Sequence, residues 1–309
     1  MDKYMDMLDK KNVTENIYDV VEKEIQRLKR IPVTSPDANV ARNYIEYMLA
    51  TPWTEKTEED NDLKKAQEMG IRLILASGRP DKGLIQYVEE LEMDKYHGLC
   101  VSYNGSRVFD CQTGEVLFNE TMTVEEGRAV LEHMKKFNVR PMLYKGDYMY
   151  VNDVYDCMVT DGDESLNIIK YESRNCNYKL CEMDDLVEFA DWPMNKILTA
   201  GDDVYLQAHF EEMREPFKDT LNSMFTAPFY YEFTRKGIDK AKALDTVLTD
   251  LGYKSEELIA FGDSQNDKSM IQYAGIGVAM ENATDELKNA ADEITLSNEQ
   301  DGIAEALYR

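Results

Sequence analysis

Two short apolar runs, each followed by a polar turn, constrain the fold of this chain most strongly. The first is Ile71 to Ala76, which leads into Ser77-Gly78-Arg79-Pro80, and the second is Leu258 to Phe261, which leads into Gly262-Asp263-Ser264-Gln265-Asn266-Asp267. Brief, mostly apolar runs bounded by turns are typical of parallel strands buried on both faces. A helix and a second strand, at 98–105, follow the first run, and this order implies a right-handed crossover. The sequence therefore predicts an α/β fold with a doubly wound parallel sheet.

The remaining elements divide the chain into an appendage, a core and an insertion. A hairpin is expected over 106–120, and alternating helices and strands then continue to about residue 233, including a helix at 124–137 and a strand at 196–199. After that point the pattern of the first apolar runs returns. We therefore expect a helical appendage with an acidic linker (1–61), a Rossmann-like core (62–121 and 234–309) and an inserted α/β cap domain (122–233).

The appendage is predicted to contain two helices. Apolar residues between Glu15 and Arg30 recur at helical spacing with charges between them. Ser35-Pro36-Asp37 resembles an N-cap followed by proline, and it opens a second helix that runs to about Leu49. The stretch from Thr51 to Asn61 is polar and acidic, so we expect an exposed, mobile linker that proteases cut first.

The charge balance excludes some partners. The chain carries 60 acidic and 35 basic residues, for a net charge of −25, which repels nucleic acids and anionic membranes. The five cysteines are odd in number and include no C-x-x-C pair, so reduced thiols in a cytoplasmic protein are expected. The charged start of the chain has no apolar signal-peptide region, and no apolar run approaches the length of a membrane span.

The most specific chemical signal is the acidic turn after Phe261. Carboxylates at the carboxyl end of a parallel strand lie where such sheets bind ligands, and Mg²⁺ prefers one or two carboxylates, phosphate oxygens and water. Asp263 is the candidate direct ligand, and Asp267 would hold a water or orient its neighbours. The alternative is an acidic strand-to-helix turn in which an Asp caps the helix.

Several motifs in order make the chain similar to a known family. They are Leu75 to Pro80, Tyr103-Asn104-Gly105, Lys236-Gly237-Ile238-Asp239-Lys240, Gly262 to Asp267, Ala274 to Ala283 and Asp301-Gly302-Ile303. Residues from about 62 to 309 resemble the Cof-type phosphatases of the haloacid dehalogenase-like superfamily. The resemblance implies Mg²⁺-dependent hydrolysis of small phosphate monoesters, such as sugar phosphates, with the cap domain choosing the phosphorylated metabolite.

The resemblance also implies roles for individual residues. Ser77 would bind the phosphoryl group, and Lys240, rather than Lys236, would neutralise the nucleophile and phosphoryl oxygens. Asn266 would contact the substrate, with Asn104 and Arg79 as weaker candidates. Each has a structural alternative: Ser77 and Asn104 can stabilise turns, and a lysine can belong to a solvated helix start.

The chain departs from the family at the nucleophile. The family begins with an apolar strand that ends in Asp-x-Asp-Gly-Thr, in which the first Asp attacks phosphorus and the second is the general acid and base. Asp60-Asn61-Asp62 has the D-x-D spelling, but the residues before it, 56–59, are polar and charged. We interpret it as solvated linker and expect a gap in the middle of the core sheet, where the missing strand would lie.

The first sixty residues have a different resemblance. The segment Glu22 to Pro32, with Ser35-Pro36, Val40 to Ile45 and Pro52-Trp53, is similar to a helical segment just before the ATPase module of the Lon protease. The chain has no G-x-x-x-x-G-K-[ST] loop, so neither ATP hydrolysis nor proteolysis is implied. An ordinary amphipathic helical extension is the alternative.

Two main functional hypotheses follow, and a helical partner-binding role for residues 12–50 is a third. The first is a Cof-type phosphatase scaffold whose catalysis is impaired because the nucleophile segment is missing. The second is a non-catalytic chimeric or interaction protein that keeps the phosphatase fold. An apolar strand ending in Asp before residue 62 would favour intact catalysis, and the sequence contains none.

Overall fold

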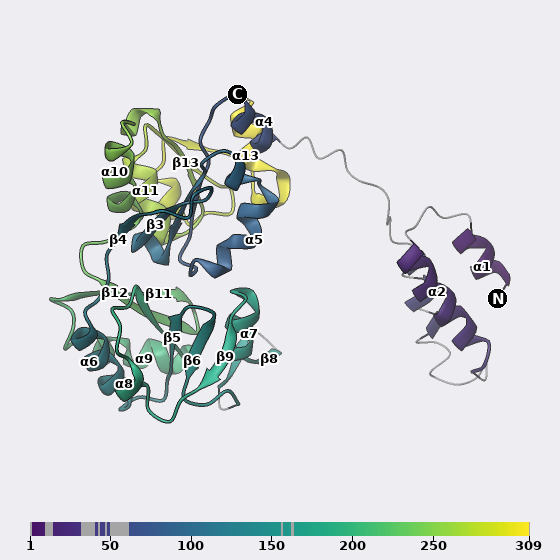
Figure 1. Cartoon of the computed structure of the whole chain (residues 1–309), viewed down its shortest axis with the longest axis horizontal. Coiled ribbons are helices and arrows are strands. Elements are labelled where there is room, and N and C mark those ends of the chain that lie inside the picture. Colours follow the sequence, from purple (N-terminus) through teal and green to yellow (C-terminus); the bar gives the residue numbers. More distant parts are fainter. Residues whose placement is uncertain are drawn as a thin grey trace. The chain divides into compact units, whose positions relative to one another are not determined.

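A computed structural model describes residues 2–9, 15–31, 41–42, 44–46, 48–49, 62–155, 157–161 and 164–308. The chain divides into two compact units, Met1–Asn61 and Asp62–Arg309 (Figure 1). Ser35-Pro36, the linker segment 51–61 and the dipeptide Asp60-Asn61 lie outside the described residues. None of the described helices is long and apolar enough to cross a membrane.

The first unit is a small helical body with its own core. Helix α1 (Asp2–Asp9) and helix α2 (Glu15–Leu28) are joined by further helical residues between 41 and 49. Their apolar faces bury one cluster, which consists of Leu8, Val21, Ile25, Leu28, Ala41, Ile45, Met48 and Leu49. The helix predicted between Glu15 and Arg30 is present, whereas α1 lies in a segment for which we predicted no helix.

In the second unit, separate sheets form in the residues predicted as core (62–121 and 234–309) and in those predicted as cap (122–233), and we keep these two names for them. The first core sheet has the order β1-β2-β3-β4 and consists of β1 (Ile74–Ala76), β2 (Leu99–Ser102), β3 (Arg107–Asp110) and β4 (Val116–Asn119). Strands β1 and β2 are parallel, and the other two pairs are antiparallel. Helix α4 (Asp62–Glu68) precedes β1, and helix α5 (Lys82–Glu90) connects β1 to β2. The predicted strand–helix–strand unit and hairpin are both present.

The second core sheet is entirely parallel. It has the order β13-β14-β15 and consists of β13 (Ile259–Gly262), β14 (Ile276–Ala279) and β15 (Glu293–Ile294). Its helices are α10 (Lys240–Asp250), α11 (Lys268–Tyr273), α12 (Asp285–Lys288) and α13 (Gly302–Leu307). The polar turn that follows β13 therefore lies at the carboxyl end of a parallel sheet, as predicted.

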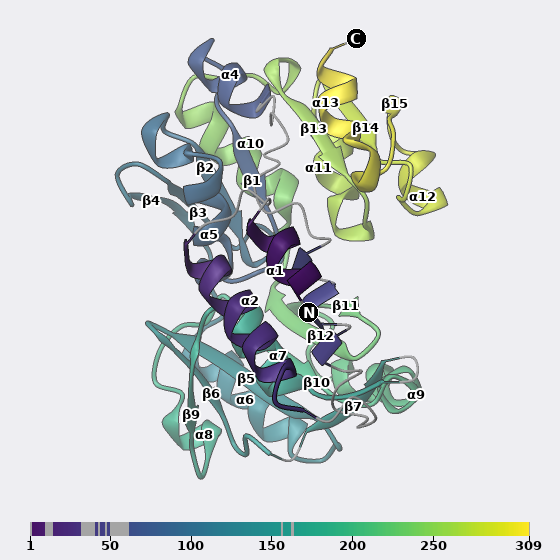
Figure 2. The ribbon, with the colours of Figure 1, turned by 90° about the vertical axis from the view of Figure 1, so that its right-hand side faces the viewer.

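The two core sheets are not joined to each other. Among the described residues β1 pairs only with β2, and β13 pairs only with β14 (Figure 2). Helix α10 holds the halves together, because its apolar residues share one buried cluster with Ile74 and Ala76 of β1 and with Ala260 of β13. The expected gap in the middle of the sheet is thus present in this part of the chain.

The cap is built on a separate, six-stranded sheet. Its order is β11-β12-β10-β5-β6-β9, with β5 (Arg140–Lys145), β6 (Tyr148–Val151), β9 (Lys179–Glu182), β10 (Lys196–Ala200), β11 (Leu221–Ala227) and β12 (Tyr230–Arg235). A small hairpin of β7 (Met158–Asp161) and β8 (Glu164–Asn167) accompanies it. The helices are α6 (Val124–Met134), α7 (Ile168–Asn175), α8 (Leu186–Phe189) and α9 (Asp203–Arg214).

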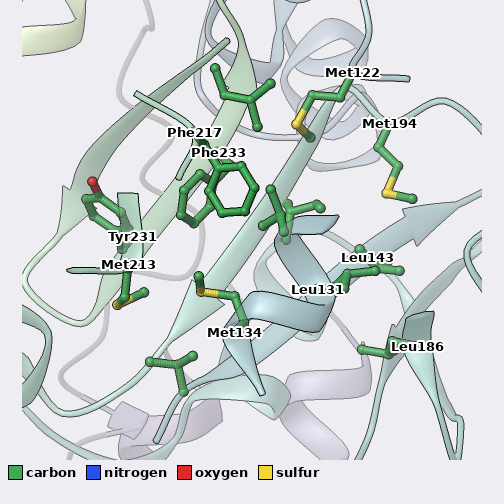
Figure 3. Packing of buried hydrophobic residues seen from close by; sticks show 14 of the residues in the cluster. Met122, Leu131, Met134, Leu143, Leu186, Met194, Met213, Phe217, Tyr231 and Phe233 are labelled. Carbon is green, nitrogen blue, oxygen red and sulfur yellow. The ribbon is translucent and has the colours of Figure 1, made fainter. Parts of the chain in front are cut away.

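Aromatic and sulfur-containing side chains fill the cap core. Figure 3 shows Phe217 and Phe233 beside Tyr231, with Met134 and Leu131 of α6 facing them. The Phe217 and Phe233 rings meet edge to face, with centroids 5.8 Å apart, a favourable arrangement for aromatic pairs. Because Tyr231 and Phe233 belong to β12, this packing holds that strand against the helices of the cap.

Candidate active site

Lys240 is held at the start of α10 by a helix cap. The Asp239 side chain accepts a hydrogen bond of 2.8 Å from the backbone N–H of Lys242, which fixes where the helix begins. The Lys240 side chain is 3% exposed, and its Nζ lies 2.5 Å from Oδ1 of Asp267. The ammonium that was predicted to face a phosphoryl group is therefore already paired with a carboxylate.

Asp267 uses its second oxygen to shape the turn after β13. Its Oδ2 accepts hydrogen bonds of 3.1 and 3.2 Å from the backbone N–H groups of Asp263 and Ser264. Gly262 permits this close approach, because a Cβ atom there would lie 2.6 Å from the Cβ of Asp267. Both oxygens of Asp267 are thus engaged, so this residue orients the turn rather than offering a free ligand.

Asp263 presents the freer carboxylate of the pair. Its side chain is exposed, and Oδ2 accepts only a long hydrogen bond, 3.4 Å, from Nδ2 of Asn282. No group of three or more His, Cys, Asp or Glu side chains among the described residues could hold a metal ion. A Mg²⁺ ion at this turn would have one direct protein carboxylate, with water and phosphate oxygens as its other ligands. This donor set fits a weak site.

Ser77 follows β1 and caps a turn. Its Oγ accepts a hydrogen bond of 3.1 Å from the backbone N–H of Arg79, and its carbonyl accepts one of 3.0 Å from the N–H of Asn104. Ser77 therefore stabilises the turn after β1, which was the structural alternative to phosphate binding. A hydroxyl that caps a turn through its lone pair still has a proton to donate, so a role toward phosphate stays a prediction.

Asn104 lies at the meeting point of the core and the cap. It adopts a left-handed conformation with φ of 55°, which asparagine tolerates better than most residues. Its Oδ1 accepts a hydrogen bond of 2.9 Å from Nδ2 of Asn266, and its Nδ2 donates to Glu232 of β12. The structure thus brings Asn104 and Asn266 together, and a cap carboxylate accepts a hydrogen bond from the Asn104 amide.

Two cap residues, Glu232 and Lys196, complete this contact and were not predicted. Their side chains are 1% and 5% exposed, the carboxylate and ammonium lie 3.4 Å apart, and Lys196 donates to the carbonyl of Gly78 at 3.1 Å. The available sequence signal was one acid within the apolar run of β12 and one lysine opening the apolar run of β10. Lys196 and Glu232 meet Gly78 and Asn104 only when the cap is folded onto the core. Local sequence patterns do not predict such a long-range contact.

The side chains of Arg79 and Lys236 bond to residues outside the turn after β13. The Arg79 guanidinium donates to the Tyr87 hydroxyl at 3.0 Å and lies over the same ring, on α5. Lys236 donates to the carbonyl of Lys218 at 2.8 Å, away from the turn after β13. A substrate contact by Arg79 stays a prediction, and it would require the side chain to leave Tyr87.

A cavity of about 580 Å³ lies over the asparagine pair. Its core side includes Asn104, Ser264 and Asn266, and its cap side is the β11 segment Met224 to Thr226. The cavity is also lined by Asp239, Gln265, Lys268, Ser269, Gln272 and Glu286, so its walls combine amides, hydroxyls and charged side chains of both signs with one aromatic ring, Phe225. This composition suits a small polar molecule whose orientation is fixed by a few hydrogen bonds.

Two buried cysteines, Cys100 and Cys176, are poor candidates for an attacking group. Burial, with the nearby Glu172 carboxylate, raises the pKa of the Cys176 thiol to about 12. The hydrogen bond with Cys111, together with burial, raises the pKa of the Cys100 thiol far above its usual range. Neither is a thiolate at neutral pH, and a thiolate is the reactive form. Asp62 opens helix α4 rather than ending a strand.

Comparison with known proteins adds independent information. The model of the haloacid dehalogenase-like hydrolase family matches residues 53–307. A crystal structure of such a hydrolase from Bacteroides thetaiotaomicron is 33% identical with a TM-score of 0.72, and the match covers 80% of this chain and 89% of that one.

The names of two relatives state a substrate. A 5-amino-6-(5-phospho-D-ribitylamino)uracil phosphatase of Bacillus subtilis is 26% identical over 82% of this chain and 91% of its own length. A pyridoxal phosphate phosphatase of Escherichia coli is 26% identical over 80% of this chain and 88% of its own length. Both matches span nearly the whole of the relative.

Proposed function

Because this chain belongs to the haloacid dehalogenase-like hydrolase family, we propose that its second unit binds small phosphate monoesters but hydrolyses them poorly. The main support for this proposal is that the core is divided into two half-sheets. The Lys240 ammonium is paired with Asp267 and not with a carboxylate from a strand between those sheets. In this proposal the phosphoryl-binding groups are retained, whereas the described residues include no strand that would carry the attacking carboxylate between the half-sheets.

Substrate binding is assigned to the cavity above the asparagine pair. Asn104 and Asn266 offer amide groups from the core, and Met224 to Thr226 cover the opposite side from the cap. The relatives named above act on a phosphoribityl compound and on pyridoxal phosphate, which are small phosphorylated molecules. The proposed ligand class is therefore a small phosphate ester, such as a sugar phosphate, selected by the cap.

The residues present can bind and polarise a phosphate. Lys240 and the Ser77 hydroxyl, which are not among the residues that line the cavity, would hold the phosphate oxygens next to it. Asp263 would hold Mg²⁺, which would neutralise phosphate charge when it is bound. General acid and base assistance contributes about 10²–10⁴-fold in rate, and loss of a nucleophile removes more than that. Binding without efficient turnover is the expected behaviour.

A binding measurement tests this proposal separately from turnover. Titration calorimetry with fructose 6-phosphate and with pyridoxal 5′-phosphate, each with Mg²⁺, should show saturable binding that weakens in Asn266→Ala. Lys236→Ala is the matched control, because Lys236 bonds to Lys218 outside the cavity. Equal binding by wild type and Asn266→Ala would reject this cavity as the site.

The second candidate is an interaction protein that keeps the fold without the reaction. The observation in its favour is the separate apolar core of the first unit, because a helical body with its own core can act as a binding module. Absence of saturable binding for every phosphate ester tested would favour this candidate over the first.

A further inference from the structure

Two cysteine thiols touch across neighbouring strands of the first core sheet. Cys100 belongs to β2, and Cys111 is the residue that directly follows β3. Their Sγ atoms lie 3.6 Å apart. The sulfur of Cys181, by contrast, lies 4.0 Å from the thioether sulfur of Met183, with which no disulfide can form. Cys100 and Cys111 are therefore a pair of thiols in contact, which is the starting arrangement for an intramolecular disulfide.

The strand register places both thiols on the same face of the sheet. Strands β2 and β3 are antiparallel, and Cys100 lies opposite Phe109. The backbone N–H of Cys111 donates a hydrogen bond of 2.8 Å to the carbonyl of Gly98, which extends this pairing by one residue. Residues two apart on a strand point to the same face, so Cys111 shares the face of Phe109 and of Cys100. Gly98, opposite Cys111, has no side chain that would separate the two thiols.

The two thiols differ in burial. Cys100 is 0% exposed and belongs to an apolar cluster with Leu84 and Phe109. Cys111 is half-buried, and the turn that follows it, residues 112–115, is exposed. The oxidation of a cysteine depends on its access to solvent, so a small oxidant reaches Cys111 first. Cys100 can then react with Cys111 without contacting the oxidant itself.

We propose that Cys100 and Cys111 form a reversible redox modification site whose oxidant is a hydroperoxide. Cys111 reacts with the oxidant, and Cys100 then closes an intramolecular disulfide. This inference goes beyond phosphate binding and does not depend on it, because it rests on the contact between the sulfurs, the strand register and the difference in burial. The reduced pair is a contact within the core, and the oxidised pair is a covalent link between β2 and the end of β3.

The reaction with hydrogen peroxide balances in two steps. In the first, the Cys111 thiolate attacks one peroxide oxygen, an S–O bond forms and the O–O bond breaks. The departing hydroxide takes up the proton that the thiol released and leaves as water. In the second, the Cys100 sulfur attacks the Cys111 sulfur, an S–S bond forms, and the S–O bond breaks. The Cys100 proton departs with the hydroxyl group as a second water, so the two thiols lose two electrons and the peroxide gains them.

The link needs only a small movement of the two side chains. A disulfide joins its sulfurs at about 2.05 Å, so the two sulfurs approach each other by about 1.5 Å when the bond forms. Rotation about the two Cα–Cβ bonds can supply this movement while β2 stays paired with β3. The closed loop contains the turn Tyr103–Gly105, in which Asn104 bonds to Asn266. Oxidation therefore fixes the base of the hairpin that carries this amide.

Mass spectrometry of the full chain tests the site. The protein is treated with hydrogen peroxide without denaturant, its remaining thiols are alkylated, and it is digested with trypsin without reduction. Cleavage after Lys95, Arg107 and Arg128 places the two cysteines in different peptides, 96–107 and 108–128. We expect these peptides to stay joined, with a mass about 2 Da below the sum of the two free peptides. Dithiothreitol should separate them.

Three variants assign the roles of the two thiols. Cys111→Ser should form no such link. Cys181→Ser is the matched control at another half-buried cysteine, and it should form the link as the wild type does. Cys100→Ala lacks the second thiol, so the sulfenic acid on Cys111 should persist and be labelled by dimedone.

Three results would overturn the proposal. One is a peroxide-treated wild type in which peptides 96–107 and 108–128 stay separate. Another is a Cys100→Ala variant in which dimedone leaves Cys111 unlabelled. The third is loss of the link in Cys181→Ser, because the reaction would then depend on a thiol outside the pair.

Discussion

Lys240 and Asp267 form a buried ion pair that joins the start of α10 to the turn after β13, with Nζ and Oδ1 2.5 Å apart. The same carboxylate bonds to the N–H groups of Asp263 and Ser264. One carboxylate thus orients both the lysine and the exposed Asp263. Since α10 also connects the two half-sheets, this pair is central to the stability of the core.

Lys240→Met should destabilise the second unit strongly. Removing one member of a buried pair leaves the other charged and unpaired, which costs about 3–5 kcal/mol. Urea unfolding followed by circular dichroism measures the change. Lys242→Met is the matched control, because Lys242 is exposed and its pair with Asp245 is long, 3.7 Å. Similar unfolding midpoints for the two variants would contradict the importance given to this pair.

Mg²⁺ should bind weakly at Asp263. Titration calorimetry with MgCl₂ should show a site in the wild type that is lost in Asp263→Ala, because that residue offers the freer carboxylate of the turn. Asp250→Ala removes an exposed carboxylate at the other end of α10 and should leave the titration unchanged. Identical curves for the wild type and Asp263→Ala would end this hypothesis.

The cap should depend on the Lys196–Glu232 pair for its attachment to the core. Both groups are buried, Glu232 accepts from Asn104, and Lys196 donates to the carbonyl of Gly78. Glu232→Leu should therefore cost about 3 kcal/mol and also weaken phosphate-ester binding, because Asn104 and Asn266 lose their orientation. The double variant with Lys196→Met should recover part of the stability without recovering the binding. If the double variant recovered both stability and phosphate-ester binding, the Lys196–Glu232 pair would have a structural role only.

Acid should remove the stabilisation that Asp110 contributes. Burial raises the pKa of the Asp110 carboxyl, but hydrogen bonds from the backbone N–H of Thr113, from His97 and from the N–H of Gln112 outweigh it, so the pKa lies below its ordinary value. Such a group stabilises the fold fully above its unfolded pKa of about 3.9, and this contribution is lost as the pH falls through the folded pKa.

The difference in unfolding free energy between wild type and Asp110→Asn should therefore shrink below about pH 4. Urea titrations from neutral pH to pH 3 measure it, with the exposed Asp94→Asn as the control for general acid effects. A difference that stays constant, or that grows on acidification, would show that the ionised carboxylate is not the stabilising form.

The sequence predicts helices and strands well where the spacing of apolar residues and the flanking turn residues indicate the same element. The hairpin over 106–120, the strand at 196–199 and the parallel strand before Gly262 all form. The predicted strand from Ile71 is shorter and begins at Ile74, and among the described residues it pairs only with β2.

The site was predictable only where its residues follow strands in the sequence. Asp263, Asp267 and Asn266 share one turn, and a local motif identified them. Glu232 acts from another domain, 128 residues away from Asn104, so only the folded cap brings the two together. The orientation of Arg79 toward Tyr87 likewise depends on how α5 packs, which the residue types alone do not fix.

Steady-state phosphatase activity tests the central claim most directly. The full chain, assayed on p-nitrophenyl phosphate, sugar phosphates and pyridoxal 5′-phosphate with and without Mg²⁺, should show turnover close to background, because no strand in the described part of the chain brings a carboxylate between β1 and β13. Mg²⁺-dependent turnover that disappears in Asp60→Asn or Asp62→Asn would contradict the account and identify the relocated D-x-D as the nucleophile.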